Sequence, residues 1–171
     1  MSRRGLNTEE TAAPTKRIHT EVSGFTLIEL TICITIIIII AAVAIPNLVR
    51  SRMVSNEGSA IANIRTITTS EHQYQSAAVD PWPSGMGKFG TLADLAATLP
   101  SYIDEPLATG ARQGYTYEVV PGGVDGAPVF ACNADPLVMD GTGSKGFFAD
   151  ESGVITWKAG ASAGPADLPV Q

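Results

Sequence analysis

The stretch that decides the fold is GFTLIELTICITIIIIIAAVAIPNLVR, residues 24–50. From Phe25 to Ile45 it holds 21 residues that are almost all apolar, with one carboxylate, Glu29, near the start. A helix rises about 1.5 Å per residue, so this run covers about 31 Å, close to the hydrocarbon thickness of a bilayer. The stretch therefore predicts a helix that spans a membrane, and it raises the question of why a carboxylate lies inside it.

The charge of the chain is spread unevenly around this run. Four Lys/Arg precede it, and Arg50 and Arg52 follow it, a distribution that favours a cytoplasmic N-terminus. From Asp80 onward four Lys/Arg face eleven Asp/Glu, a net charge of −7. This acidic part argues against nucleic acid as a direct partner. The length of 171 residues suits one ordinary domain with an appendage.

Two other interpretations of the apolar run stay open. The triplet Ala42–Ala44 has the small-x-small form that signal peptidase prefers, so cleavage after Ala44 could release a secreted soluble binding domain. The long polar lead-in and Glu29 argue against a signal peptide, because a carboxylate in a membrane segment costs a few kcal/mol. A plain single-span anchor is the other possibility, and it would tolerate substitution of Gly24.

Residues 24–29, GFTLIE, followed by the Ile-rich run and by Pro46, resemble the N-terminus of a type IV prepilin. The resemblance implies that a prepilin peptidase cuts between Gly24 and Phe25 and methylates the new N-terminal amine of Phe25. Residues 1–24 would then be a leader peptide, and the prepilin would cross the inner membrane once with its N-terminus in the cytoplasm. The family's assembly platform and motor would polymerise the chain into a cell-surface pilus used for motility, adhesion or DNA uptake.

The same resemblance gives Glu29 a role in assembly, as the fifth residue of the mature chain. The amine of Phe25 in one subunit could pair with Glu29 of its neighbour, which removes the cost of an isolated buried carboxylate. The alternative is that the Glu29 side chain only snorkels to the membrane interface. A pseudopilin of a type II secretion system shares this N-terminus and is the alternative function within the same class.

Beyond the run, residues 46–78 continue as an amphipathic helix that ends near Ala77. Its apolar positions recur at three-, four- and seven-residue spacings: Leu48, Met53, Ala60, Ile61, Ile64, Ile67 and Tyr74. Pro46 predicts a kink, because it lacks an amide hydrogen and crowds the preceding turn. Gly58 is a second weak point. The resemblance adds that the helix near Pro46 can lose regular structure when subunits pack.

The remainder predicts a small globular part over residues 79–158, which begins with a Pro- and Gly-rich segment at 79–90. Residues 91–99 read as a short helix capped by Thr91, and residues 100–114 as a loop. Four antiparallel strands follow within 115–120, 127–132 and 145–157, with turns at 121–126 and 150–153. Packed on the long helix, they give an α+β fold. The tail, 159–171, is expected to be mobile.

The globular part, residues 79–158, is called the head below. Few residues of the chain are candidates for catalysis or ligand binding. A mature chain would keep one histidine, His72, without a nucleophile or base assigned to it, and the sequence has no phosphate-binding or dinucleotide motif and no metal-type Cys/His spacing. We therefore expect no enzymatic activity and no cofactor. Cys33 and Cys132 are interpreted as two small buried apolar side chains rather than a disulfide.

An acidic segment offers the one candidate ion site. Its four carboxylates, which could converge on calcium, are Asp135, Asp140, Asp150 and Glu151. They lack the alternating spacing of an EF-hand loop, and Asp commonly stabilises turns without an ion. Solvated turn acids are therefore the main interpretation, with calcium as the alternative.

Overall fold

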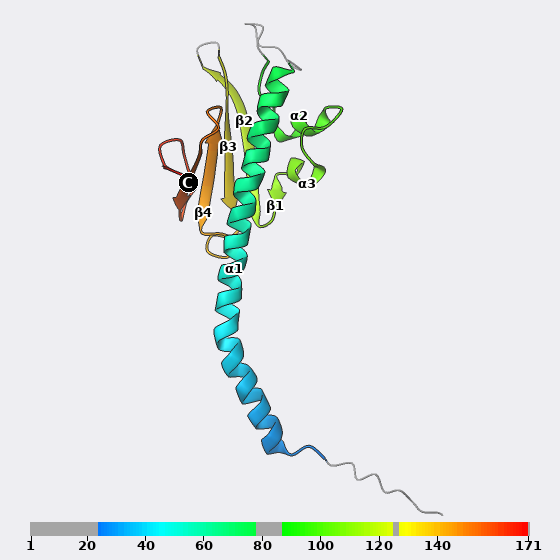
Figure 1. Ribbon diagram of the computed structural model, residues 1–171, viewed down its shortest axis with the longest axis vertical. Helices are drawn as coiled ribbons and strands as arrows, with labels where there is room; N and C mark the ends of the chain where they lie inside the picture. The colour runs from blue at the N-terminus through cyan, green and yellow to red at the C-terminus, as the bar shows by residue number, and fades with distance from the viewer. Residues whose placement is uncertain (1–23, 78–86, 125–126, 171) are drawn as a thin grey trace, which may run out of the picture. The chain divides into compact units, whose positions relative to one another are not determined.

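The computed structural model describes residues 24–77, 87–124 and 127–170. Its helices are α1 (Leu27–Ser76), α2 (Leu92–Ala97) and α3 (Glu105–Ala108). Its strands are β1 (Ala111–Arg112), β2 (Tyr115–Val124), β3 (Ala127–Pro136), β4 (Lys145–Asp150), β5 (Ile155–Ala159) and β6 (Leu168–Pro169). The strands form one antiparallel sheet in which each pairs with the next along the chain (Figure 1). The α+β fold is confirmed, with six strands rather than about four.

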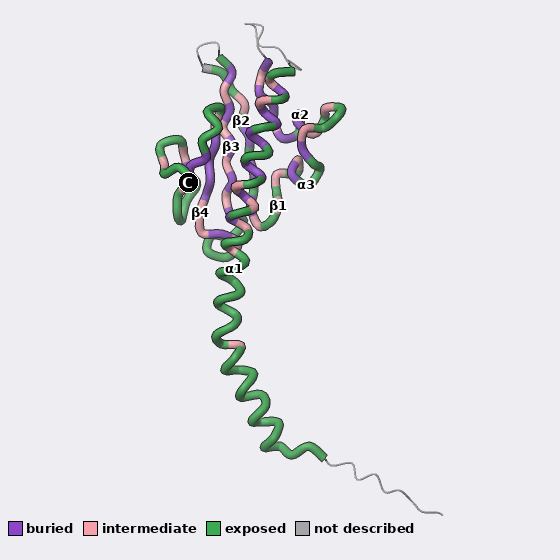
Figure 2. The backbone as a smooth tube through the Cα atoms, viewed as in Figure 1, coloured by how far each residue is buried: buried purple, intermediate pink, exposed green. Residues whose placement is uncertain are grey.

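The chain divides into two compact units, Met1–Ile40 and Ala41–Gln171, and α1 contributes to both. In the first unit every described residue, 24–40, is exposed to solvent. In the second unit the buried residues gather where the C-terminal part of α1 lies on the sheet (Figure 2). Two expected segments lie mostly outside the described residues. They are the leader, of which residues 1–23 are not described, and the Pro/Gly segment, of which residues 79–86 are not described.

The amphipathic pattern of α1 is confirmed from residue 57 onward. Ala60, Ile64 and Ile67 are fully buried and Tyr74 is nearly so, because their spacing places them on the helix face that meets the sheet. Leu48, which we included in the same face, is exposed, so the packed face begins later than its periodicity suggested. Pro46 lies inside α1, whose helical assignment continues through it; the kink and the unwinding stay predictions.

The β2–β3 hairpin is confirmed and is longer than expected. Tyr115, Tyr117 and Val119 face the core in alternation, and ten residue pairs join the strands from Tyr115–Pro136 to Val124–Ala127. Residues 121–124, expected as a turn, continue β2. A proline is tolerated at Pro121 because β1 pairs only with the first two residues of β2, so among the described residues one edge of β2 has no neighbouring strand there.

The β4–β5 hairpin is also confirmed, with register from Lys145–Ala159 to Ala149–Ile155. Its turn ends at Gly153, whose φ of +74° lies in the left-handed region that favours glycine. The Gly153 amide donates to the Asp150 carbonyl at 3.0 Å. The turn expected at residues 150–153 is therefore formed by local backbone chemistry.

Helix α2 shows the expected cap at Thr91. The Asp94 amide donates to the Thr91 hydroxyl at 3.3 Å, and the Thr91 amide donates to the Asp94 carboxylate at 2.8 Å. The two bonds form a capping box, which satisfies backbone donors at the helix start.

Two segments that were expected to lack regular structure contain some. Residues 100–114, predicted as a loop, contain α3 and β1. The tail, predicted as mobile, returns to the sheet: β6 pairs with β5, and the Val170 amide donates to the Ile155 carbonyl at 2.8 Å. Ala163 is buried on the way. A two-residue strand has too few positions for a periodicity signal, so neither β1 nor β6 was visible in the sequence.

Candidate assembly site at the start of the long helix

The Gly24–Phe25 bond lies before the first helical residue, Leu27, in a segment without regular structure. Both residues are exposed, Phe25 by 78%. A Cβ built on Gly24 meets nothing within 4 Å, and its φ lies outside the left-handed region. The fold itself therefore gives no reason for glycine at this position.

Glu29 forms a capping box with Thr26 at the start of α1. The Glu29 amide donates to the Thr26 hydroxyl at 3.2 Å, while the Thr26 amide and hydroxyl donate to Glu29 Oε2 at 3.0 and 2.7 Å. The same arrangement caps α2 at Thr91 and Asp94. This role was not predicted, although the pattern Thr-x-x-Glu before an apolar run is a known sequence signature of a capping box.

The capping box leaves part of Glu29 available. Both hydrogen bonds end on Oε2, and Oε1 accepts none within the described part of the chain. The whole side chain is exposed. Glu29 is thus satisfied as a helix cap through one oxygen and open to a further donor through the other.

The apolar run presents its side chains outward over its whole length. By length and composition α1 could span a membrane, and the most apolar part of it is not buried. A signal sequence near the N-terminus has the same length and composition. The exposed large apolar side chains in this part are Phe25, Leu27, Ile28, Leu30, Ile32, Ile34, Ile36, Ile37, Ile38, Ile39, Ile40, Val43 and Ile45.

Polar atoms inside the run are satisfied by the helix itself. The hydroxyl of Thr31 donates to the Leu27 carbonyl at 2.9 Å, and that of Thr35 to the Thr31 carbonyl at 2.7 Å. Such bonds suit a helix in lipid, where water is not available as a partner. Cys33 is exposed here, whereas Cys132 is fully buried, so the expectation of two buried cysteines holds only for Cys132; both thiols are free.

A buried carboxylate ties α1 to the β3–β4 connection. Glu57 accepts hydrogen bonds from the Ser144 amide at 3.0 Å and hydroxyl at 2.7 Å, and its second oxygen lies 3.2 Å from Lys145 Nζ. Burial opposes ionisation, yet the Ser144 hydrogen bonds and Lys145 together hold the pKa of Glu57 below its ordinary value. One residue earlier, Asn56 donates to the Thr142 carbonyl at 2.8 Å.

A second buried carboxylate, Glu71, is only half satisfied. Its Oε2 accepts the Gly90 amide at 2.9 Å, while Oε1 is buried and has no hydrogen-bond partner among the residues that the structure describes. Burial raises the pKa of Glu71 to about 7, and the negative charge of Asp94 adds to the shift. Neither Glu57 nor Glu71 was predicted to be buried, because a carboxylate on an amphipathic helix normally indicates the solvent face.

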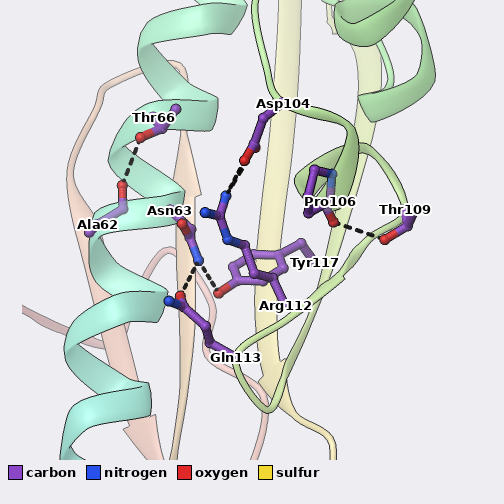
Figure 3. Close-up of polar contacts among 9 residues, drawn as sticks. All are labelled: Ala62, Asn63, Thr66, Asp104, Pro106, Thr109, Arg112, Gln113 and Tyr117. Carbon is purple, nitrogen blue, oxygen red and sulfur yellow. Dashed lines mark hydrogen bonds and ion pairs between the residues drawn. The ribbon is translucent and has the colours of Figure 1, made fainter.

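Further polar contacts position the segment before β2, as Figure 3 shows. Asn63 Nδ2 on α1 donates to the Tyr117 hydroxyl at 2.9 Å and to Gln113 Oε1 at 3.2 Å. Arg112 donates to both carboxylate oxygens of Asp104 at 2.8 and 2.9 Å. The Asn63 bonds fix the segment before β2 to α1, and the Arg112–Asp104 pair joins β1 to the start of α3.

His72 lies half-buried on α1, edge-on to the rings of Phe89 and Phe130 at 5.8 and 6.2 Å between centroids. It borders a cavity of about 330 Å³ that Arg65 and Ile155 also line. Among the described residues, no side chain forms a hydrogen bond to its ring. The geometry therefore shows no nucleophile–base pair built on this histidine.

The four carboxylates of the calcium alternative are not brought together. Asp135 accepts a hydrogen bond from the Ser162 hydroxyl at 2.9 Å, and Asp150 accepts the Ser152 amide at 2.9 Å within its turn. Asp140 and Glu151 are exposed. Within residues 24–77, 87–124 and 127–170, no group of three or more His, Cys, Asp or Glu side chains could hold a metal ion.

No match to this chain is found among models of known protein families, curated proteins or solved structures, and its function is therefore inferred from its own residues.

Proposed function

We propose that the chain is a structural subunit of a type IV pilus. In this proposal a prepilin peptidase cuts after Gly24 and methylates the amine of Phe25. The mature chain is held in the inner membrane by residues 25–45 and is then polymerised by an assembly platform and motor into a helical fibre. Its main partner is a further copy of itself, and no catalysis by the chain is involved.

The observation that carries the proposal is the exposure of every large apolar side chain from Phe25 to Ile45. Burying one Leu, Ile or Phe side chain is worth about 1.5–3 kcal/mol, and thirteen large apolar side chains are exposed from Phe25 to Ile45. A chain in water would not leave this surface uncovered. Lipid can cover it in a stored subunit, and the same helices of neighbouring copies can cover it in a fibre.

Gly24 supports processing at this site rather than a plain anchor. No described residue lies within 4 Å of a Cβ built on Gly24, and its backbone is not left-handed, so an alanine would fit the described part of the fold without strain. A requirement for glycine must then come from a partner that reads the exposed Gly24–Phe25 segment. A peptidase with a small binding site for the residue before the cut has that property.

Glu29 can serve as a cap and as an assembly contact at once. Its Oε2 stabilises the start of α1 through Thr26, and its free Oε1 can accept the charged amine of a neighbouring Phe25. Contacts between unlike surfaces that do not close into a ring produce filaments. A head-to-tail pair of Phe25 amine and Glu29 carboxylate is of this kind.

Intact-mass measurement with N-terminal sequencing of the protein from its native host tests the proposal. We expect a chain that starts at Phe25 and carries one extra methyl group. A start at Ile45 would mean a secreted soluble domain, and an uncut chain would mean a plain anchor; either result rejects the proposal. Electron microscopy then separates a pilus subunit, with surface fibres, from a pseudopilin of a secretion system.

Three substitutions separate the two roles of Glu29. Glu29→Gln keeps the volume and a capping side chain but removes the charge, since Gln also serves in capping boxes. Thr26→Val keeps the charge but removes the capping hydroxyl, and Glu29→Ala removes both. We expect fibres from Thr26→Val but few or none from the two Glu29 variants, at equal amounts of processed protein in the membrane. Normal fibres from Glu29→Gln would show that Glu29 serves only as a cap.

A further inference from the structure

A cavity of about 330 Å³, called the His72 cavity below, is formed by the second half of α1 and the segment that leads from β4 into β5. Its lining residues are Arg65, Thr68, Thr69, His72, Gly153 and Ile155. The four residues from α1 are three, four and seven positions apart, so they share one face of the helix. The volume is at the lower end of the range for small-molecule sites, which indicates a ligand of few atoms.

Arg65 brings a permanent positive charge to this cavity. The side chain is exposed, and its guanidinium has no ion pair and no hydrogen bond within the described part of the chain. Arg112 differs, because both oxygens of Asp104 occupy its donors. No Asp or Glu is among the described residues that line the His72 cavity. The N–H donors of Arg65 are therefore available to a ligand, and a guanidinium pairs well with an oxyanion.

Two further polar side chains of the cavity have no partner among the described residues. His72 is half-buried, and its ring forms no hydrogen bond there. Thr68 is only 8% exposed, and its hydroxyl is buried and has no hydrogen-bond partner. The other threonines of α1 each donate to the carbonyl four residues earlier: Thr31, Thr35, Thr66 and Thr69. A buried hydroxyl without a partner is unfavourable, so it indicates that a group outside the chain supplies the partner.

A second cavity, of about 360 Å³, also borders Arg65 but lacks such free donors. Its other lining residues are Thr66, Thr69, Ser70, Gln73 and Tyr102. The threonine and serine hydroxyls all donate to backbone carbonyls, at distances of 2.8 to 3.1 Å. Unsatisfied donors therefore distinguish the His72 cavity from this one.

The charge around the His72 cavity favours a ligand with one negative charge. Arg65 is the single Arg or Lys among its described lining residues. From Asp80 onward the chain has a net charge of −7, and the field of this charge opposes a multiply charged anion such as phosphate. The planar guanidinium matches a carboxylate through two parallel hydrogen bonds. Ile155 gives the cavity an apolar wall, which suits the carbon part of an organic acid.

We propose that the His72 cavity binds the carboxylate of a small organic molecule that carries one negative charge. Arg65 pairs with the carboxylate, and His72 donates a ring N–H to it. The Thr68 hydroxyl joins them after a rotation about χ1, since threonine in a helix populates two χ1 rotamers. This ligand site goes beyond the proposed function and does not depend on it, because the second half of α1 is packed on the sheet whether or not fibres form.

The ring of His72 provides the readout of the test. The sequence has two histidines, so His72 is the only one left in the full chain with His19→Gln. This chain is prepared in detergent with isotope-labelled histidine. Acetate, glucuronate and inorganic phosphate are titrated separately at constant pH, with sodium chloride adjusted to keep the ionic strength constant. The nuclear magnetic resonance shifts of the ring carbons and nitrogens are recorded.

We expect saturable shifts of the His72 ring with acetate and glucuronate. Arg65→Gln should weaken the binding by about 10- to 100-fold, because it removes a charged hydrogen-bond partner. Thr68→Val keeps the side-chain volume but removes the hydroxyl, and it should weaken the binding by several-fold. Arg52→Gln is the matched control: it removes the same charge from an exposed site on the same helix and should leave the affinity unchanged. Denaturant unfolding checks that each variant is folded.

Four results would overturn the proposal. The His72 ring could show no saturable shift with either carboxylate, which would mean that the cavity does not bind this group. Arg65→Gln could bind as tightly as the natural chain, or Arg52→Gln could lose as much affinity, which would indicate only general attraction of anions. Tighter binding of phosphate would mean that the carboxylate is the wrong class. None of these results bears on processing at Gly24 or on fibres, so the proposed function stands or fails separately.

Discussion

The two halves of α1 have the same secondary structure and opposite surroundings. From residue 57 onward the helix buries Ile64 and Ile67 completely against the sheet, whereas Ile38 in the first half is 64% exposed. Helices in proteins owe most of their stability to packing, not to propensity. The second half therefore obtains its packing from its own chain. Under the proposed function, the first half obtains its packing from lipid or from other copies of the chain.

The largest expected effect contrasts one isoleucine from each half. Ile64→Ala should lower the free energy of unfolding of the head by about 2–5 kcal/mol, because it leaves a cavity in a packed core. Ile38→Ala should leave that free energy unchanged, since no atom of the head covers Ile38. Denaturant unfolding of the full chain in detergent, followed by near-ultraviolet circular dichroism, measures both. An equal loss in the two variants would mean that the two halves do not differ in this way.

The two buried carboxylates of α1, Glu71 and Glu57, should change the stability of the head with pH in opposite directions. Because the pKa of Glu71 is raised to about 7, the folded chain keeps a proton that the unfolded chain releases near its ordinary value of 4.5. Stability from this group is then present below pH 4.5 and is lost as the pH rises to about 7, by about 3 kcal/mol in all. Glu71→Gln should remove this dependence, so its stability relative to the natural chain should rise between pH 4.5 and pH 8. A constant difference over that range would contradict the buried, protonated state.

The contribution of Glu57 to stability should change with pH in the opposite direction to that of Glu71. Its pKa is lowered, so its contribution is present above the ordinary value and is lost as the pH falls through the folded-state pKa. Glu57→Ala should cost about 1–3 kcal/mol near neutral pH, because the Ser144 amide loses its acceptor. Glu29→Ala, on the same helix but exposed, is the control and should not change head stability. Urea unfolding at pH 7 compares the two.

The smallest expected change in stability comes from a glycine within α1. Gly58 is exposed within α1, and a Cβ placed there meets nothing within 4 Å. Gly58→Ala should therefore stabilise the head by about 0.5–1 kcal/mol through the lower entropy of the unfolded chain. Thermal unfolding measures the gain. A loss of stability instead would show that residue 58 needs the backbone freedom of glycine.

Elements marked by a periodic pattern or a local motif could be predicted from the sequence, whereas individual tertiary contacts could not. The long helix, the β2–β3 hairpin, the β4–β5 hairpin and the Thr91 cap each follow from periodicity or a local motif. Glu57 and Glu71 were missed because only the tertiary fold places a buried partner, Ser144 or Gly90, beside each carboxylate. The capping box of Thr26 and Glu29 could have been predicted from the Thr-x-x-Glu motif. It was not, because Glu29 was interpreted only as a costly carboxylate within a membrane span.

The simple order of the sheet has a consequence for how the head folds. Each strand pairs with the strand made just before it, so no strand must wait for a partner from a distant part of the chain. Sheets built from sequential hairpins have low contact order, which favours fast folding. If the chain crosses a membrane starting from its N-terminal side, the sheet can grow strand by strand as it emerges. Unpaired strand edges, which promote aggregation, are then exposed only briefly at any moment.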